Sequence, residues 1–264
     1  MGSGVLFLIF LLCIVLIPRN SSESILRFPS EKDAVANILG KPKVGVDDNL
    51  YCDSWRLAVE TNNAGAWTRI PERCQEFVKE YITGGRYSSD SQIIGNFSSD
   101  FARSVNLGAD GRDAWVFDID DTLLSNVPYY AEHGFGTEIF DEASFDNWVT
   151  LAEAPALPAS LRLYKELQAL GFKIFLLTGR NEYQRDATEA NLLTAGYNNW
   201  ERLFLRGISD QGKPATIYKS EKRAELVSEG YWIQGSSGDQ WSDLLGFAVA
   251  TRSFKLPNPM YYIP

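Results

Sequence analysis

The stretch Val116-Phe117-Asp118-Ile119-Asp120-Asp121-Thr122-Leu123-Leu124-Ser125-Asn126 decides the fold of this chain. It continues an apolar run that begins at Ala114 and has the length typical of a buried strand. Because side chains alternate along a strand, Asp118 and Asp120 are expected on the same side of the strand's carboxyl end. Ligands of open α/β sheets bind at that end. The stretch therefore predicts a buried strand that brings two carboxylates into a ligand site.

Two neighbouring carboxylates repel each other and require a cation, a shared proton or both. One chemistry uses both: a divalent cation neutralises the pair, one Asp attacks, and the other holds a proton for the leaving group. A polar strand end that caps a following helix would use the same residue types without any chemistry. A calcium loop also begins D-x-D-x-T, but it needs Gly and Glu where this chain has Leu123 and Tyr129.

The composition is that of a globular protein and excludes several classes of site. The chain has 264 residues, of which 45% are hydrophobic, enough for one large domain or a domain with a small addition. The net charge of −9 argues against a nucleic-acid partner. His133 is the single histidine, which excludes a site with two histidine ligands. The sequence contains neither G-x-S-x-G nor G-x-x-x-x-G-K-[ST].

The amino-terminal segment predicts entry into the secretory pathway. The apolar run from Val5 to Ile17 is shorter than the roughly 20 residues of a membrane span, so residues 1–20 are predicted to be a signal peptide, with an uncleaved anchor as the alternative. Cleavage would leave Cys52 and Cys74, which are then expected to form one disulfide. The triplets beginning at Asn20 and Asn96 are potential glycosylation sites of the same route.

The rest of the chain divides into three predicted regions. Apolar and aromatic residues at helical spacing from Asp53 to about Val105 predict that residues 21–110 form an N-terminal helical region packed on the core. Residues 111–264 are predicted to form the catalytic core. The irregular, aromatic residues 127–157 are expected to form a small cap insert over the strand ends. Its aromatic side chains either hold an aryl or nucleoside leaving group or simply pack the insert.

Beyond the insert, predicted helices and strands alternate. Such alternation indicates α/β architecture, a parallel sheet with helices on both faces. Further strands are expected at Phe172–Leu177, Arg202–Arg206, Tyr231–Gly235 and Phe247–Phe254, and helices at Leu161–Leu170, Glu182–Leu193 and Ser220–Ser228.

Two polar clusters near the ends of these strands have the chemistry of a phosphate site. Thr178-Gly179 follows the strand from Phe172 and offers donors to a phosphate oxygen, although a helix cap would look the same. Lys219 precedes a predicted helix and can neutralise both a nucleophile and a transferring phosphoryl group. Lys213 and Lys222 are close in sequence, and spacing does not choose among the three.

A third cluster supplies carboxylates for a metal ion. Asp239 and Asp243 follow the strand from Tyr231, and oxygen ligands of this kind suit Mg²⁺. Asp239 can bind directly, while Asp243 braces the site or binds through water. An acidic turn that opens a helix is the structural alternative.

With these four clusters in this order, the chain resembles the haloacid-dehalogenase-like (HAD) phosphohydrolases, which have a Rossmann-like sheet. Their motifs are D-x-D-x-[TV], a Ser/Thr strand end, a Lys, and an acidic strand end. The chain is most similar to the plant class B acid phosphatases and the related vegetative storage proteins. The likeness covers nearly the whole mature chain, and it is carried by Tyr51 to Trp67, Phe117 to Asn126, Ala154 to Pro158, Phe175 to Arg180, Tyr218 to Arg223, Gly238 to Gly246 and Lys255 to Ile263.

The resemblance implies a role for each motif residue. Asp118 would be the nucleophile, and Asp120 the general acid and base whose backbone carbonyl reaches the metal. The remaining roles are phosphate binding by Thr178, Gly179 and Lys219, metal binding by Asp118, Asp120, Asp239 and Asp243, and a structural hydroxyl at Thr122.

The function predicted from these roles is a Mg²⁺-dependent acid phosphatase that hydrolyses small phosphomonoesters through an aspartyl phosphate. The alternatives are a storage protein with vestigial activity and phosphotransfer to alcohols. Some storage relatives replace the nucleophile, whereas this chain keeps Asp118. The predicted location is the apoplast or the vacuole, without stable membrane association after signal cleavage. The resemblance also allows a homodimer.

Overall fold

The computed structural model describes residues 47–264. The predicted signal peptide and the potential glycosylation site at Asn20 lie outside this range. Asn96, in the second such site, is exposed on a helix. No helix within residues 47–264 combines the length and the apolar composition that a membrane crossing requires.

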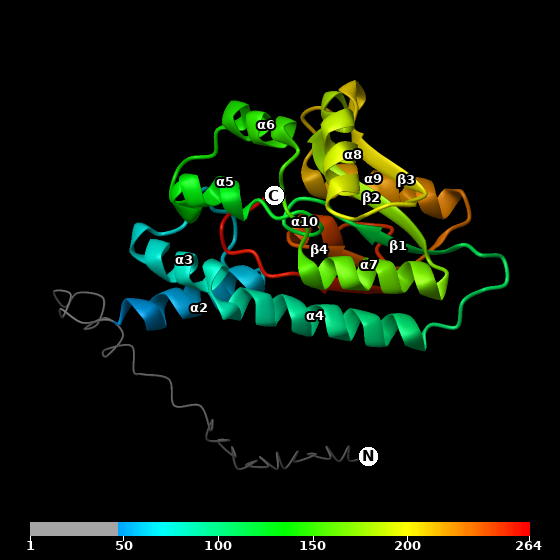
Figure 1. Ribbon diagram of the computed structural model, residues 1–264, viewed down its shortest axis with the longest axis horizontal. Coiled ribbons are helices and arrows are strands. Elements are labelled where there is room, and N and C mark those ends of the chain that lie inside the picture. The colour runs from blue at the N-terminus through cyan, green and yellow to red at the C-terminus, as the bar shows by residue number, and fades with distance from the viewer. Residues whose placement is uncertain (1–46) are drawn as a thin grey trace, which may run out of the picture. The chain divides into compact units, whose positions relative to one another are not determined.

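The centre of the structure is a five-stranded parallel sheet with strand order β3-β2-β1-β4-β5 (Figure 1). The strand in which the opening stretch begins, β1, lies in the middle and pairs with both β2 and β4. Because all neighbours are parallel, the carboxyl ends of the strands meet at one edge. The strands are β1 (Asp113–Phe117), β2 (Lys173–Asn181), β3 (Arg202–Arg206), β4 (Trp232–Gly238) and β5 (Arg252–Lys255). The predicted α/β class with a parallel sheet is confirmed.

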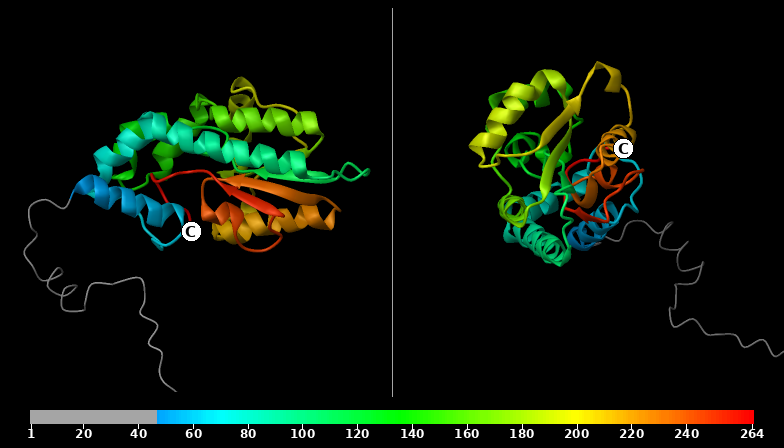
Figure 2. Two further views of the ribbon diagram at one scale, coloured as in Figure 1. Left: turned by 90° about the horizontal axis from the view of Figure 1, so that it is seen from below. Right: turned by 90° about the vertical axis from the view of Figure 1, so that its right-hand side faces the viewer.

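Helices cover both faces of the sheet, as predicted, and the side chains of β1 show how. Trp115 and Phe117 point into one apolar core with side chains of α4, α7 and α8. Ala114 and Val116 point into a second core with side chains of α9. The two helical layers lie on opposite sides of the strands in Figure 2. The helices of these layers are α4 (Gly85–Ser104), α7 (Pro158–Leu170), α8 (Arg185–Thr194) and α9 (Ala215–Ser228).

The N-terminal part of the described chain is helical, and a disulfide fastens it. Cys52 on α2 (Asp48–Glu60) is bonded to Cys74 at the end of η1 (Glu72–Cys74), directly before α3 (Gln75–Thr83). The predicted pairing of these two cysteines is therefore present. The side chain of Asp47 caps α2 by accepting a hydrogen bond from the backbone N–H of Asn49 (3.1 Å).

The aromatic insert comprises α5 (Val127–Glu132), η2 (Gly134–Gly136) and α6 (Glu142–Leu151). Tyr129, Tyr130 and Phe135 are buried and share one apolar core with Val78 and Tyr81 of α3. The sequence left open whether the aromatic side chains of the insert hold a leaving group or pack the insert. Packing accounts for these three.

The prediction of a strand at Phe247–Phe254 is wrong for residues 247–251, because the observed strand β5 begins only at Arg252 and ends at Lys255. Within that range, Ala248 has a positive φ of 49°, which lies outside the β region of backbone conformations. The buried guanidinium of Arg223 donates hydrogen bonds to the carbonyls of Leu245, Phe247 and Ala248 (2.5, 3.1 and 3.1 Å). These carbonyls therefore pair with a side chain instead of a neighbouring strand.

We expect the Cys52→Ser/Cys74→Ser double variant to lose about 3 kcal/mol in free energy of unfolding. The bond joins residues 22 positions apart, and a loop of that size removes about this much chain entropy from the unfolded state. Urea denaturation of the variant and the wild type measures the difference. Equal midpoints and slopes would show that the disulfide does not stabilise this fold.

Candidate active site

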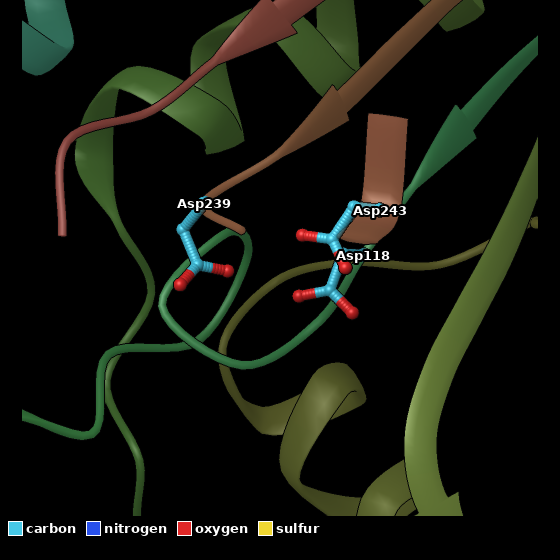
Figure 3. A group of neighbouring side chains, drawn as sticks. All are labelled: Asp118, Asp239 and Asp243. Atoms are coloured by element: carbon cyan, nitrogen blue, oxygen red, sulfur yellow. The ribbon is translucent and has the colours of Figure 1, made fainter. Parts of the chain in front are cut away.

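Three aspartates predicted as metal ligands lie together at the carboxyl edge of the sheet. Asp118 directly follows β1, Asp239 directly follows β4, and Asp243 lies on the short helix α10 (Trp241–Leu244). Figure 3 shows their carboxylates facing one another. Each contributes an oxygen, and these oxygens lie within 4.8 Å of one another. Two Mg–O bonds span about 4.2 Å, so one magnesium ion could bind these oxygens after shifts of about half an ångström or less. We call these three residues the carboxylate cluster.

Lys219 is the lysine that reaches the carboxylate cluster. Its ammonium nitrogen lies 2.5 Å from Asp118 Oδ1 and 2.5 Å from Asp243 Oδ1, and all three side chains are at most 6% exposed. The other two candidates lie elsewhere: Lys213 pairs with Asp210 and Glu221, and Lys222 with Glu225.

The sequence placed Lys219 just before a helix, which is wrong. Helix α9 begins at Ala215, after Pro214, so that Lys219 lies in its second turn. Proline is favoured near the start of a helix because its fixed φ suits the first turn, and this signal was available in the sequence. From its helical position, the side chain points toward the carboxyl ends of β1 and β4, where Asp118 and Asp243 accept its hydrogen bonds.

The electrostatics of the carboxylate cluster show an excess of buried negative charge. Burial raises the pKa of Asp118 well above its ordinary value, against the opposing effect of Lys219. Burial and the nearby Asp243 also raise the pKa of Asp239, to about 6. Burial alone would lower the pKa of Lys219, but Asp118 and Asp243 raise it, so the lysine stays charged. Lys219 thus pairs with two of the three buried carboxylates, and a divalent cation would balance the remaining negative charge.

Asp120 lies apart from the cluster and has its own partners. The guanidinium of Arg180 donates to it at 2.8 and 3.1 Å, and Asn126 Nδ2 donates at 2.9 Å. Although burial raises the pKa of Asp120, the charge of Arg180 outweighs it and lowers the pKa below the ordinary value. Arg180 and Asn126 are the functional candidates that the sequence analysis quoted without assigning a role.

Asn126 also connects Asp120 to the insert. Its amide oxygen accepts a hydrogen bond from the indole of Trp148 on α6 (2.9 Å). Asp146, on the same helix, accepts hydrogen bonds from Tyr183 (2.6 Å) and Gln184 (2.9 Å), in the segment that follows β2. Helix α6 is therefore fastened to two of the segments that form the site.

The predicted phosphate-binding pair lies at the carboxyl-terminal end of β2, next to Asp120. The Thr178 hydroxyl is buried, donates toward Asp120 (3.4 Å) and accepts a hydrogen bond from the backbone N–H of Arg180 (3.1 Å). Gly179 is exposed, and a Cβ atom built on it would meet no heavy atom within 4 Å. The backbone there is open to a ligand. Thr122 binds the cluster from another side, because its hydroxyl donates to Asp239 (3.2 Å).

Two solved structures that resemble this fold are of the class C acid phosphatase from a bacterium. The class C acid phosphatase from Bacillus anthracis matches with a TM-score of 0.59 and 28% identity, over 71% of this chain and 85% of that one. A structure of the class C acid phosphatase from the same organism with tungstate bound matches with a TM-score of 0.56 and 25% identity, over the same shares.

The chain belongs to the HAD superfamily, subfamily IIIB (acid phosphatase), whose family model matches residues 39–264. Acid phosphatase 1 of Solanum lycopersicum is 54% identical over 86% of this chain and 89% of its own length. The stem 28 kDa glycoprotein of Glycine max is 49% identical over 81% of this chain and 84% of its own. Vegetative storage protein 2 of Arabidopsis thaliana is 39% identical, over 87% and 86%. The predicted enzyme class, a phosphoric monoester hydrolase, is thereby confirmed.

We expect Lys219→Met to reduce the free energy of unfolding in chelator by about 3 kcal/mol, because it leaves Asp118 and Asp243 buried without their cation. The pKa of Asp118 is already higher in the folded than in the unfolded state, and the variant raises it further. Protonation therefore stabilises the folded variant, and its deficit should be larger at pH 8 than at pH 5.

Urea denaturation at both pH values, in parallel with Lys213→Met, measures this deficit. Lys213 is a matched control because it also pairs with two carboxylates, but its own side chain is 31% exposed. An equal loss in the two variants would contradict the account of the cluster's charge.

Proposed function

We propose that this chain is a Mg²⁺-dependent acid phosphatase that hydrolyses small phosphomonoesters through an aspartyl phosphate on Asp118. The observation that supports this most strongly is the carboxylate cluster with Lys219, in which one ammonium pairs with two of three buried carboxylates. Lys219 is bound to Asp118 itself, so it lies where a phosphoryl group attached to Asp118 would need a positive charge.

Mg²⁺ fits the donor set of the cluster. Asp118 and Asp239 would hold it directly, with the backbone carbonyl of Asp120, while Asp243 would bind through water or brace Lys219. When bound, the ion neutralises the carboxylates and the phosphoryl oxygens during transfer.

The proposed reaction uses the two aspartates of the opening stretch in turn. A carboxylate oxygen of Asp118 forms a bond to phosphorus, the ester P–O bond breaks, and Asp120 donates its proton to the leaving alcohol. Asp120 then takes a proton from the water that attacks the phosphorus of the aspartyl phosphate, which releases inorganic phosphate and restores Asp118. Thr178 and the open backbone at Gly179 would orient the phosphoryl oxygens. Tungstate, an oxyanion, is bound in the Bacillus anthracis relative.

A storage role is the second candidate, because vegetative storage protein 2 is among the relatives. We favour catalysis because Asp118 is kept and is paired with Lys219. Phosphotransfer to an alcohol would use the same phosphoenzyme, and added alcohol would then yield a new ester. We further propose a secretory route to the apoplast or vacuole, consistent with the disulfide.

The first test is Asp118→Asn with p-nitrophenyl phosphate and Mg²⁺. We expect kcat/KM to fall at least about a thousand-fold, about 4 kcal/mol of transition-state stabilisation, because the amide cannot attack phosphorus. Asp53→Asn is the matched control, because Asp53 is 44% exposed and pairs with Arg56 on α2. Wild-type rates in Asp118→Asn would contradict the covalent mechanism, and negligible turnover of the wild type would favour storage.

We also expect an acid optimum that depends on Arg180. Asp120 must be protonated when the alcohol leaves, and Arg180 lowers its pKa, so activity should fall as the pH rises through that pKa. Arg180→Met removes the charge, raises the pKa of Asp120, and should move the alkaline limb of the kcat/KM profile upward by about one pH unit. An unchanged limb in a folded variant would mean that Asp120 is not the titrating acid.

A further inference from the structure

The carboxyl-terminal segment, residues 256–264, has no regular secondary structure but is held firmly against the protein. Leu256, Asn258 and Met260 are all less than 5% exposed. Figure 1 shows the segment, in red, running from the sheet toward α5. Tyr261 stacks there on Tyr130 of α5, with ring centroids 5.1 Å apart. An irregular segment buried in this way must satisfy its polar groups with specific partners.

One of these partners is a member of the carboxylate cluster. Asn258 Nδ2 donates to Asp239 Oδ2 at 2.7 Å, and Gln240 Nε2 donates to the same oxygen at 2.8 Å. A carboxylate oxygen accepts about two hydrogen bonds, so Oδ2 is fully occupied by two neutral amides. Among the described residues, Oδ1 accepts from Thr122 alone. The amides therefore fix the rotation of the carboxylate and leave Oδ1 as the oxygen with room for a metal ion.

The orientation of the Asn258 side chain is fixed as well. Its amide oxygen accepts a hydrogen bond from the backbone N–H of Met260 (2.9 Å), a turn typical of asparagine. Because the oxygen is used in this way, the NH₂ group must face Asp239. An aspartate at position 258 would form the same turn but would direct an acceptor at the carboxylate.

The same segment also binds the loop that carries the proposed nucleophile. The Tyr261 hydroxyl donates to Asp121 Oδ2 (2.9 Å), and Asp121 Oδ1 accepts from the backbone N–H of Asn126 (2.9 Å). Asp121 is fully buried, has a φ of 53° and has no part in the proposed reaction. Its contacts are explained if its task is to fasten the loop from Asp118 to Asn126 to the carboxyl-terminal segment.

We propose that Asn258 is a positioning residue for the metal ligand Asp239, and that the carboxyl-terminal segment completes the metal site. The inference rests on the proposed function, because it assumes that the carboxylate cluster binds a divalent cation. In other proteins, removing a hydrogen bond that orients a metal ligand typically costs 10- to 100-fold in metal affinity.

The test compares the affinity of metal-depleted protein for Mn²⁺, measured from the electron paramagnetic resonance signal of the free ion. Asn258→Ser keeps an oxygen that can accept from Met260 N–H but is too short to donate to Asp239. We expect its Kd for Mn²⁺ to rise about 10- to 100-fold. Ile263→Ala is the matched control, because the side chain is 43% exposed and only the backbone of Ile263 binds Gln240. It should keep the wild-type Kd.

Thermal unfolding in EDTA separates positioning from a merely structural role. We expect Asn258→Ser to unfold at a modestly lower temperature than the wild type in EDTA, because buried Asp239 loses one donor, and the difference between the two to widen once Mn²⁺ is added. Equal Mn²⁺ affinities, or an Asn258→Ser variant that no longer folds in EDTA, would overturn the inference while leaving the proposed function intact. A wild-type protein that binds no Mn²⁺ would overturn both.

Discussion

The structure depends on holding three buried carboxylates and one lysine together at the carboxyl edge of the sheet. Each ion would lose several kcal/mol on leaving water, and only close pairing in the folded state offsets that cost. Lys219 forms two such pairs, with Asp118 and Asp243. The third carboxylate, Asp239, relies on neutral donors instead. The cluster therefore remains short of positive charge, and a divalent cation would relieve that shortage where phosphoryl transfer needs it.

The surrounding fold serves to fix these charges. The central strand β1 has apolar cores on both faces, so its carboxyl end and Asp118 cannot shift independently of the helices. Arg223 on α9 donates hydrogen bonds to the backbone carbonyls of Asp243 and Leu245. These bonds hold α10, which carries Asp243, against α9, which carries Lys219. Helix α6 and the carboxyl-terminal segment bind the site from two further directions, through Asn126 and Asn258. Elements remote in sequence thus position one small site.

Sequence reasoning found the parts of this site that follow from strand periodicity. Asp118, Thr178 and Asp239 could be placed together because the carboxyl ends of parallel strands share an edge. The predicted strand from Phe247 began too early, because its apolar residues were interpreted as part of the sheet. The carbonyls of Phe247 and Ala248 instead accept hydrogen bonds from Arg223, more than twenty residues earlier in the chain.

The residues that support the site were missed for a related reason. Arg180 binds Asp120 across a separation of 60 residues, and Asn258 binds Asp239 across 19. No local pattern marks either residue, since an arginine after a glycine and an asparagine between prolines both look like turn residues. Only the topology brings them to their partners. A buried arginine does require acceptors for its guanidinium, but its burial was not evident from the sequence.

The most direct measurement of the central claim is anomalous diffraction from crystals of the protein grown with Mn²⁺. The account predicts one strong peak within about 2.5 Å of carboxylate oxygens of both Asp118 and Asp239, with Lys219 still bound to Asp118 or Asp243. A cluster without a peak at saturating Mn²⁺, or a peak bound only by carboxylates elsewhere on the protein, would contradict it.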